Sequence, residues 1–135
     1  RGSFRLFTET MKRKTLTGEP VVIYGAGRGG ELLLREILNN KTLNINPVGF
    51  LDDDPLKIGK NIQGFPIRGG LEQLTALRKK YPIRGMLLSF NGKANQTAHQ
   101  NAIAYCRRHG LFLKTFSIQL EAVELSKKMV DPGLN

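Results

Sequence analysis

Three glycines, Gly25, Gly27 and Gly30, follow the apolar run 21–24 in the spacing G-x-G-x-x-G. In a turn of this kind the first glycine permits a tight bend and the second lets the backbone approach a diphosphate. The third lets the following helix pack close to the strand. The diphosphate would lie on the free N–H groups and the positive dipole end of that helix. The spacing therefore predicts a nucleotide site formed by Gly25, Ala26, Gly27, Arg28, Gly29 and Gly30.

An acidic residue stands where such a site needs one. The run 47–51 is a second predicted strand, and Asp52 follows it, about 20 residues after the third glycine, as a ribose-binding acid should. A carboxylate accepts from a free 2′-hydroxyl and repels a 2′-phosphate, which favours NAD over NADP, whereas Arg28 could instead bind a phosphate. Asp53 is included in the site, although it also suits a turn before Pro55. In the alternative interpretation these residues have only structural roles: the glycines at 25–30 form a tight strand-to-helix connection, and Asp52 caps the end of a strand.

Strands and helices alternate along the chain, which favours a parallel sheet with right-handed crossovers. We predict one α/β, Rossmann-like domain whose five-stranded parallel sheet has the order 3-2-1-4-5 and carries helices on both faces. Ligands bind such sheets at the carboxyl ends of the strands where the order reverses, which adds Ser89 and Phe90 to the candidate site. The expected strands are 21–24, 47–51, 62–67, 83–90 and 111–116, and the expected helices are 31–38, 71–80 and 94–109.

Length and composition suggest three segments. Residues 1–18 are expected to form a basic helix and linker, 19–120 the nucleotide-binding domain, and 121–135 a C-terminal tail. Residues 1–14 form an amphipathic segment that could pack on the domain or contact anionic lipid, and the sequence leaves this open. The single cysteine excludes an internal disulfide and fits a reducing compartment. The chain contains no apolar run long enough to cross a bilayer and no signal-peptide pattern.

The net charge of +10 makes nucleic acid the first partner to consider. Its 21 Lys and Arg residues are spread along the whole chain, only 7% of residues are aromatic, and no DNA or RNA recognition motif is present. These observations argue against nucleic acid. A positive surface that faces anionic lipid or phosphorylated ligands explains the charge equally well.

Residues for catalysis are few. Dehydrogenases and epimerases of the short-chain type need a tyrosine with a lysine four residues later, but Arg28, Gly85 and His109 occupy that position after the three tyrosines. There is no G-x-S-x-G motif for a serine nucleophile, and His99 and His109 offer no metal-binding pair. The sequence therefore predicts a binding site without catalytic residues or a metal.

Several motifs resemble a known family: 25–36, with the glycine turn, then Gly-Phe-Leu-Asp-Asp-Asp-Pro at 49–55, and Ile-Gln-Gly-Phe-Pro-Ile at 62–67. Together they look like the CoA-binding-like, NAD(P)-binding Rossmann domain of bacterial polysaccharide-biosynthesis membrane enzymes. Two groups carry this domain: capsule-type nucleoside-diphosphate-sugar 4,6-dehydratases and polyprenyl-phosphate sugar-1-phosphate transferases. These transferases are related to the undecaprenyl-phosphate N-acetylglucosaminyl-1-phosphate transferase. Segments 3–7 and 116–121 resemble the transferases more than the dehydratases. The sequence motif at 49–55 also resembles one in the N-terminal domain of sugar acyltransferases.

The resemblance implies that Gly25, Gly27, Gly30 and Asp52 line a site for NAD(P), and it leaves a nucleotide-sugar or CoA open as the ligand. It also implies a position at the cytoplasmic face of the bacterial inner membrane, beside the membrane portion of a parent enzyme, and leaves a homo-oligomer open. The catalytic residues of both groups belong to segments that this sequence does not include, so the module is expected not to be catalytic alone. The alternatives are a self-contained NAD(P)-dependent oxidoreductase, or a fragment of a sugar-nucleotide dehydratase or epimerase, and, from charge alone, a nucleic-acid-binding protein.

Overall fold

A four-stranded parallel sheet forms the centre of the molecule in the computed structural model, which describes residues 18–90, 93–117, 120 and 122–125. The strand order is β2-β1-β5-β6, and every neighbouring pair is parallel. The strands are β1 (Glu19–Tyr24), β2 (Ile45–Leu51), β5 (Gly85–Leu88) and β6 (Phe112–Thr115). The structure thus confirms the prediction of an α/β, Rossmann-like fold with a parallel sheet.

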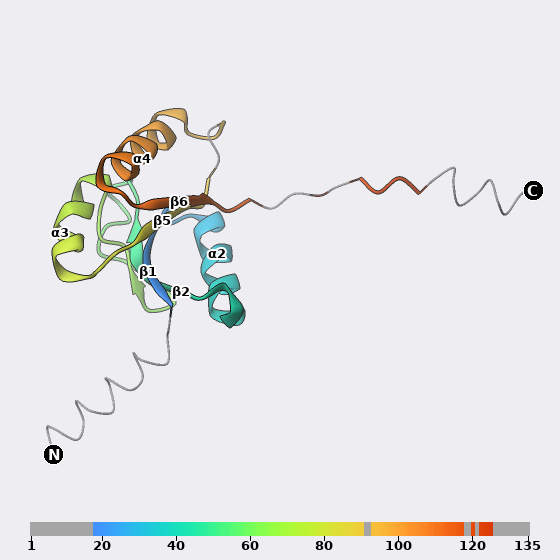
Figure 1. The fold of residues 1–135 in the computed structure, drawn as a ribbon, viewed down its shortest axis with the longest axis horizontal. Coiled ribbons are helices and arrows are strands. Elements are labelled where there is room, and N and C mark those ends of the chain that lie inside the picture. Colours follow the sequence, from blue (N-terminus) through green and yellow to red (C-terminus); the bar gives the residue numbers. More distant parts are fainter. Residues whose placement is uncertain (1–17, 91–92, 118–119, 121, 126–135) are drawn as a thin grey trace, which may run out of the picture.

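Helices cover both faces of this sheet (Figure 1). Helix α2 (Arg28–Asn39) lies on one face, and α3 (Leu74–Lys80) and α4 (Gln96–His109) lie on the other. Successive side chains of β1 alternate between the two layers: Val21 and Ile23 pack with α2, while Val22 and Tyr24 pack with α3 and α4. Because both faces are covered, all four side chains are apolar or aromatic and buried. The described residues also include two short 3-10 turns, Lys41–Leu43 and Leu71–Gln73.

The expected third strand of the sheet is absent from the described residues. Segment 61–66 instead forms a small antiparallel hairpin of β3 (Asn61–Ile62) and β4 (Phe65–Pro66), and only Ile67 makes a parallel bridge, to Phe50. The five-stranded order 3-2-1-4-5 is therefore wrong. Gln63 and Gly64 both have positive φ, 49° and 88°, as a type I′ turn requires, so the chain reverses there. Proline in β4 also lacks the N–H that a sheet ladder needs.

The expected basic helix at 1–14 lies outside the described residues, as does most of the tail 121–135. The described residues beyond β6 have no regular secondary structure, and the side chains of Leu120, Val123 and Leu125 are exposed. Within the described part of the chain, no helix has the length and apolar composition needed to cross a membrane.

Candidate functional site

The turn between β1 and α2 packs closely against the end of β5. The Gly25 N–H donates to the Leu51 carbonyl at 2.7 Å, and Gly25 has a φ of 109°, which favours glycine. A Cβ at Gly25 would collide with the Ser89 hydroxyl, and one at Gly29 would lie 2.6 Å from the Ser89 carbonyl oxygen. A Cβ at Gly30 would collide with the Gly25 carbonyl. Packing alone therefore requires glycine at these three positions.

Gly27 differs from its neighbours, because no contact with the described residues requires a glycine there. It is exposed, its φ of −92° suits any residue, and among the described residues a Cβ would meet only the Lys57 ammonium, at 3.8 Å. Gly27 is also the N-cap of α2, where no side chain forms a cap hydrogen bond. The first turn of α2 therefore presents backbone N–H groups beside open space, which suits the approach of a phosphate.

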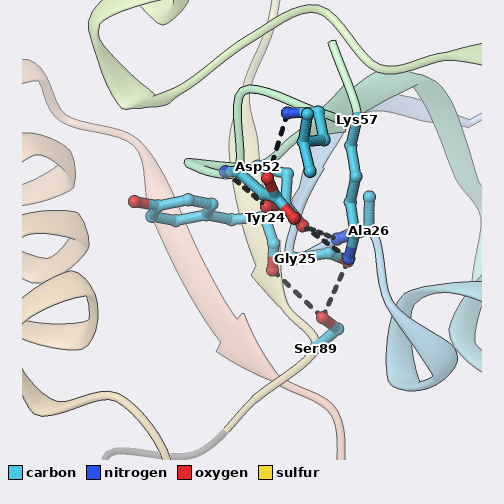
Figure 2. Close-up of polar contacts among 8 residues, drawn as sticks. Tyr24, Gly25, Ala26, Asp52, Lys57 and Ser89 are labelled. Atoms are coloured by element: carbon cyan, nitrogen blue, oxygen red, sulfur yellow. Dashed lines mark hydrogen bonds and ion pairs between the residues drawn. The ribbon is translucent and has the colours of Figure 1, made fainter. Parts of the chain in front are cut away.

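Asp52 connects the glycine turn to the end of β2 (Figure 2). Its Oδ2 accepts the Ala26 N–H at 2.8 Å, and the same oxygen lies 3.6 Å from the Lys57 Nζ. Its Oδ1 accepts the Asp54 N–H at 2.8 Å, and the side chain is 16% exposed. The predicted acid thus lies beside the turn, where it also orients the turn and Lys57.

Lys57 is the residue that sequence reasoning missed. Asp54 accepts the Leu56 N–H at 3.0 Å through its side chain and the Lys57 N–H at 3.0 Å through its carbonyl, which forms a turn after β2. This turn brings the Lys57 ammonium to Asp52 (Figure 2). A Cβ at Gly27 would lie 3.8 Å from the same ammonium. The sequence did contain a signal for Lys57: it follows the Asp54-Pro55 pair, which predicts a turn directly after the strand that precedes Asp52.

Ser89 and Phe90 lie at the turn because β1 and β5 are neighbouring parallel strands whose carboxyl ends coincide. The Ser89 hydroxyl is within hydrogen-bond distance of the carbonyl oxygens of Gly25, at 2.9 Å, and Tyr24, at 3.2 Å (Figure 2). The Phe90 ring meets the Tyr24 ring edge to face, with centroids 5.4 Å apart. Ser89 therefore supports the turn, and Phe90 extends the site across the sheet end.

Asp53 lies on the α4 side of the turn, where its Oδ2 accepts the Tyr24 hydroxyl at 2.7 Å. Together with neighbouring residues these two line a pocket of about 190 Å³, formed by Tyr24, Gly25, Asp52, Asp53, Phe90, Asn95 and Ala98. Arg28 is exposed on the first turn of α2 and makes no ion pair with the described residues. The structure therefore brings together all the candidate residues at one end of the sheet, with Arg28 at the margin.

The buried Tyr24 should make the fold sensitive to alkali. Burial, and then the hydrogen bond and charge of Asp53, raise the pKa of the Tyr24 hydroxyl above its ordinary value. The folded state then holds the proton more tightly than the unfolded state does, so this stabilisation is present below about pH 10 and decreases as the pH rises further. We expect the urea midpoint to fall above pH 10, and to fall less in Tyr24→Phe. Burial also raises the pKa of the Cys106 thiol, so part of the decline should remain. Equal declines in both proteins would contradict the role of Tyr24.

Two curated proteins are similar to this chain. It is 30% identical, over 112 residues, to the probable polysaccharide biosynthesis protein EpsC of Bacillus subtilis, an alignment that covers 82% of this chain and 18% of EpsC. It is 29% identical, over 93 residues, to the capsular polysaccharide biosynthesis protein CapD of Staphylococcus aureus, covering 65% of this chain and 16% of CapD. The chain thus spans less than a fifth of the length of either relative.

Solved structures show the same fold. The crystal structure of UDP-D-quinovosamine 4-dehydrogenase from Vibrio fischeri superposes with a TM-score of 0.63 and 25% identity, covering 86% of each chain. RSP, a Rex-family repressor crystallised with β-NADH, superposes with a TM-score of 0.60 and 20% identity over 96% of this chain and 65% of RSP. At the level of sequence, the CoA-binding domain family matches residues 1–109. Since this match includes most of the 135 residues, the protein belongs to the CoA-binding domain family.

Proposed function

We propose that the protein is the nucleotide-binding module of a bacterial enzyme of cell-envelope polysaccharide synthesis. It binds a dinucleotide or a nucleotide-sugar at the glycine turn and is not catalytic by itself. The observation that carries this proposal is Gly27, an exposed helix N-cap where packing against the described residues requires no glycine and where a Cβ would face the Lys57 ammonium. The similarity to EpsC and CapD supports a role in polysaccharide synthesis.

In the proposed complex the phosphates of the ligand lie over Gly27 and the first turn of α2. Lys57 and Arg28 supply positive charge there, and the helix N-terminus supplies N–H donors. Asp52 accepts the ribose hydroxyl. Each oxygen of the Asp52 carboxylate can accept two hydrogen bonds. The bond from the Ala26 N–H therefore leaves the carboxylate able to accept a hydrogen bond from the ligand. NAD is favoured over NADP because a 2′-phosphate would lie against this carboxylate.

The module belongs, in this proposal, to a longer enzyme at the cytoplasmic face of the inner membrane. The small share of EpsC and CapD that the chain covers is consistent with a part of a larger protein. The net charge of +10 suits an anionic lipid surface close by. Residues 19–120 are assigned to nucleotide binding, 1–18 to the basic N-terminal helix or linker, and 121–135 to the C-terminal tail.

A panel of ligands tests this function directly. NAD, NADP, CoA, UDP-sugars and UMP are each added to the purified chain, and binding is measured by thermal shift and calorimetry. A ligand at 100 times its dissociation constant stabilises the folded state by about 2.7 kcal/mol, which raises the Tm by several degrees. We expect NAD or a UDP-sugar to raise the Tm, and NAD to bind at least about tenfold more tightly than NADP, a difference of about 1.4 kcal/mol. If none of these compounds changes the Tm, the proposal is contradicted.

A self-contained NAD-dependent oxidoreductase is a second candidate function. It is favoured by the similarity to a UDP-D-quinovosamine 4-dehydrogenase over 86% of both chains. Incubation of the protein with NAD and UDP-sugars, followed at the absorbance of NADH, separates the two candidates. The proposed module gives binding without turnover. NADH production that is lost in Asp52→Ala would favour the oxidoreductase instead.

A further inference from the structure

A second pocket lies beside the amino-terminal half of β2, whereas the glycine turn lies at the carboxyl end of that strand. It has a volume of about 340 Å³ and is lined by Asn46, Pro47, Val48, Gly64, Phe65, Pro66, Arg68 and Tyr81. Asn46 precedes Asp52 by six residues and Val48 precedes it by four, which places these two lining residues roughly 13 to 20 Å from Asp52 along an extended strand. The pocket shares no lining residue with the pocket at the glycine turn.

Arg68 brings an incompletely paired guanidinium to this pocket. Its Nε is buried and has no hydrogen-bond partner among the described residues. Its Nη2 donates to the Tyr81 hydroxyl at 3.3 Å, and the guanidinium carbon lies 5.4 Å from the centroid of the Tyr81 ring. The two ion pairs found within the described part of the chain do not include Arg68. A buried donor without a partner destabilises the folded state, and more so when the group is charged.

The fold holds this arginine in a defined place. The backbone N–H of Arg68 donates to the Phe50 carbonyl at 2.9 Å, which holds the residue beside β2. A Cβ at Gly49 would lie 3.1 Å from the Arg68 Nε and 3.0 Å from the Pro66 carbonyl oxygen, so a glycine in β2 makes room for the side chain. The pairing of β1 with β2 also shifts register next to this position, between Val21 and Val22. The guanidinium is therefore held between Gly49 of β2 and the Tyr81 ring.

We propose that this pocket binds a small organic anion, whose carboxylate or phosphate is held by Arg68 and Tyr81. A guanidinium presents several N–H donors in a planar fork that matches an oxyanion, and Arg68 lines this pocket together with Tyr81. Four of the lining residues, Pro47, Val48, Phe65 and Pro66, are apolar, so the ligand carries an apolar group beside the anion. A pocket with apolar walls and a few convergent polar groups is typical of a small-molecule site.

NMR of the full chain tests this inference, because the Arg68 Nε–H gives a signal of its own in a proton–nitrogen spectrum. Benzoate, phenyl phosphate, acetate and inorganic phosphate are titrated separately. We expect saturable movement of the Arg68 Nε–H signal with benzoate, phenyl phosphate or both, and at least tenfold weaker binding of acetate and inorganic phosphate. A response to benzoate alone assigns a carboxylate, and a response to phenyl phosphate alone assigns a phosphate. No movement with any probe, or equal affinity for all four, would overturn the proposal.

Two conservative variants localise the binding. Arg68→Lys keeps the positive charge but loses the planar fork, and Tyr81→Phe keeps the ring but loses the hydroxyl. We expect Arg68→Lys to weaken calorimetric binding of the responding probe at least tenfold and Tyr81→Phe to weaken it several-fold, with a wild-type Tm in both. Gly27→Val should bind the same probe with unchanged affinity, since Gly27 is not among the residues that line this pocket. Unchanged binding in folded Arg68→Lys would overturn the assignment.

Discussion

Replacement of Gly30 by alanine should prevent the protein from reaching a stable version of this fold. The new Cβ would collide with the carbonyl oxygen of Gly25 and lie 3.2 Å from the Phe50 ring. Neither is a flexible chain end: the first is backbone, and Phe50 is fully buried. Relief requires α2 to move away from β1, which would separate Leu33, Leu34 and Ile37 from the buried cluster that they share with the sheet.

The expected destabilisation by Gly30→Ala is at least about 3 kcal/mol, because overpacking of a rigid backbone contact adds to the loss of core packing. This is a large part of the total stability of a small domain. Urea unfolding followed by circular dichroism measures it. Gly27→Ala is the matched control: it makes the same chemical change in the same turn at an exposed position, so its free energy of unfolding should change by less than about 1 kcal/mol. Equal midpoints for Gly30→Ala and the wild type would show that the turn tolerates the clash.

Replacement of Gly27 by valine should have the opposite result: a folded protein that does not bind its nucleotide. The β-branched side chain would occupy the open space between the first turn of α2 and the Lys57 ammonium. The N-cap conformation is extended, which valine adopts readily, so we expect a stability loss of only about 1 kcal/mol. The phosphate, however, could no longer approach the backbone N–H groups.

We expect Gly27→Val to raise the dissociation constant of the nucleotide at least tenfold, equivalent to about 1.4 kcal/mol of binding free energy. Calorimetry with the compound that gives the largest thermal shift measures the change. Arg68→Lys is the control, because Arg68 lines the second pocket and not the pocket at the glycine turn, and the nucleotide affinity of this variant should equal that of the wild type. Unchanged affinity in Gly27→Val would mean that the glycine turn only connects β1 to α2.

The sequence by itself determined the parallel fold and the location of the candidate site. Four consecutive apolar or aromatic residues in β1 predict a strand covered on both faces, and the glycine spacing predicts the tight turn into α2. Both are local signals, because backbone conformation and burial pattern are encoded within a few neighbouring residues. The carboxyl ends of parallel strands coincide, so these signals also located Asp52 and Ser89 correctly beside the turn.

Only the tertiary structure decided which glycine is open, where Lys57 lies and how segment 61–67 folds. Gly27 and Gly30 have the same side chain, and their difference depends on contacts with Lys57 and with the Gly25 carbonyl. The hairpin replaced a fifth strand because a turn with positive φ, at Gln63 and Gly64, outweighed the strand preference of its flanks. Arg68 and Tyr81 are separated by thirteen residues and meet across the edge of the sheet. Such contacts depend on the packing of whole elements against one another, which local sequence patterns do not encode.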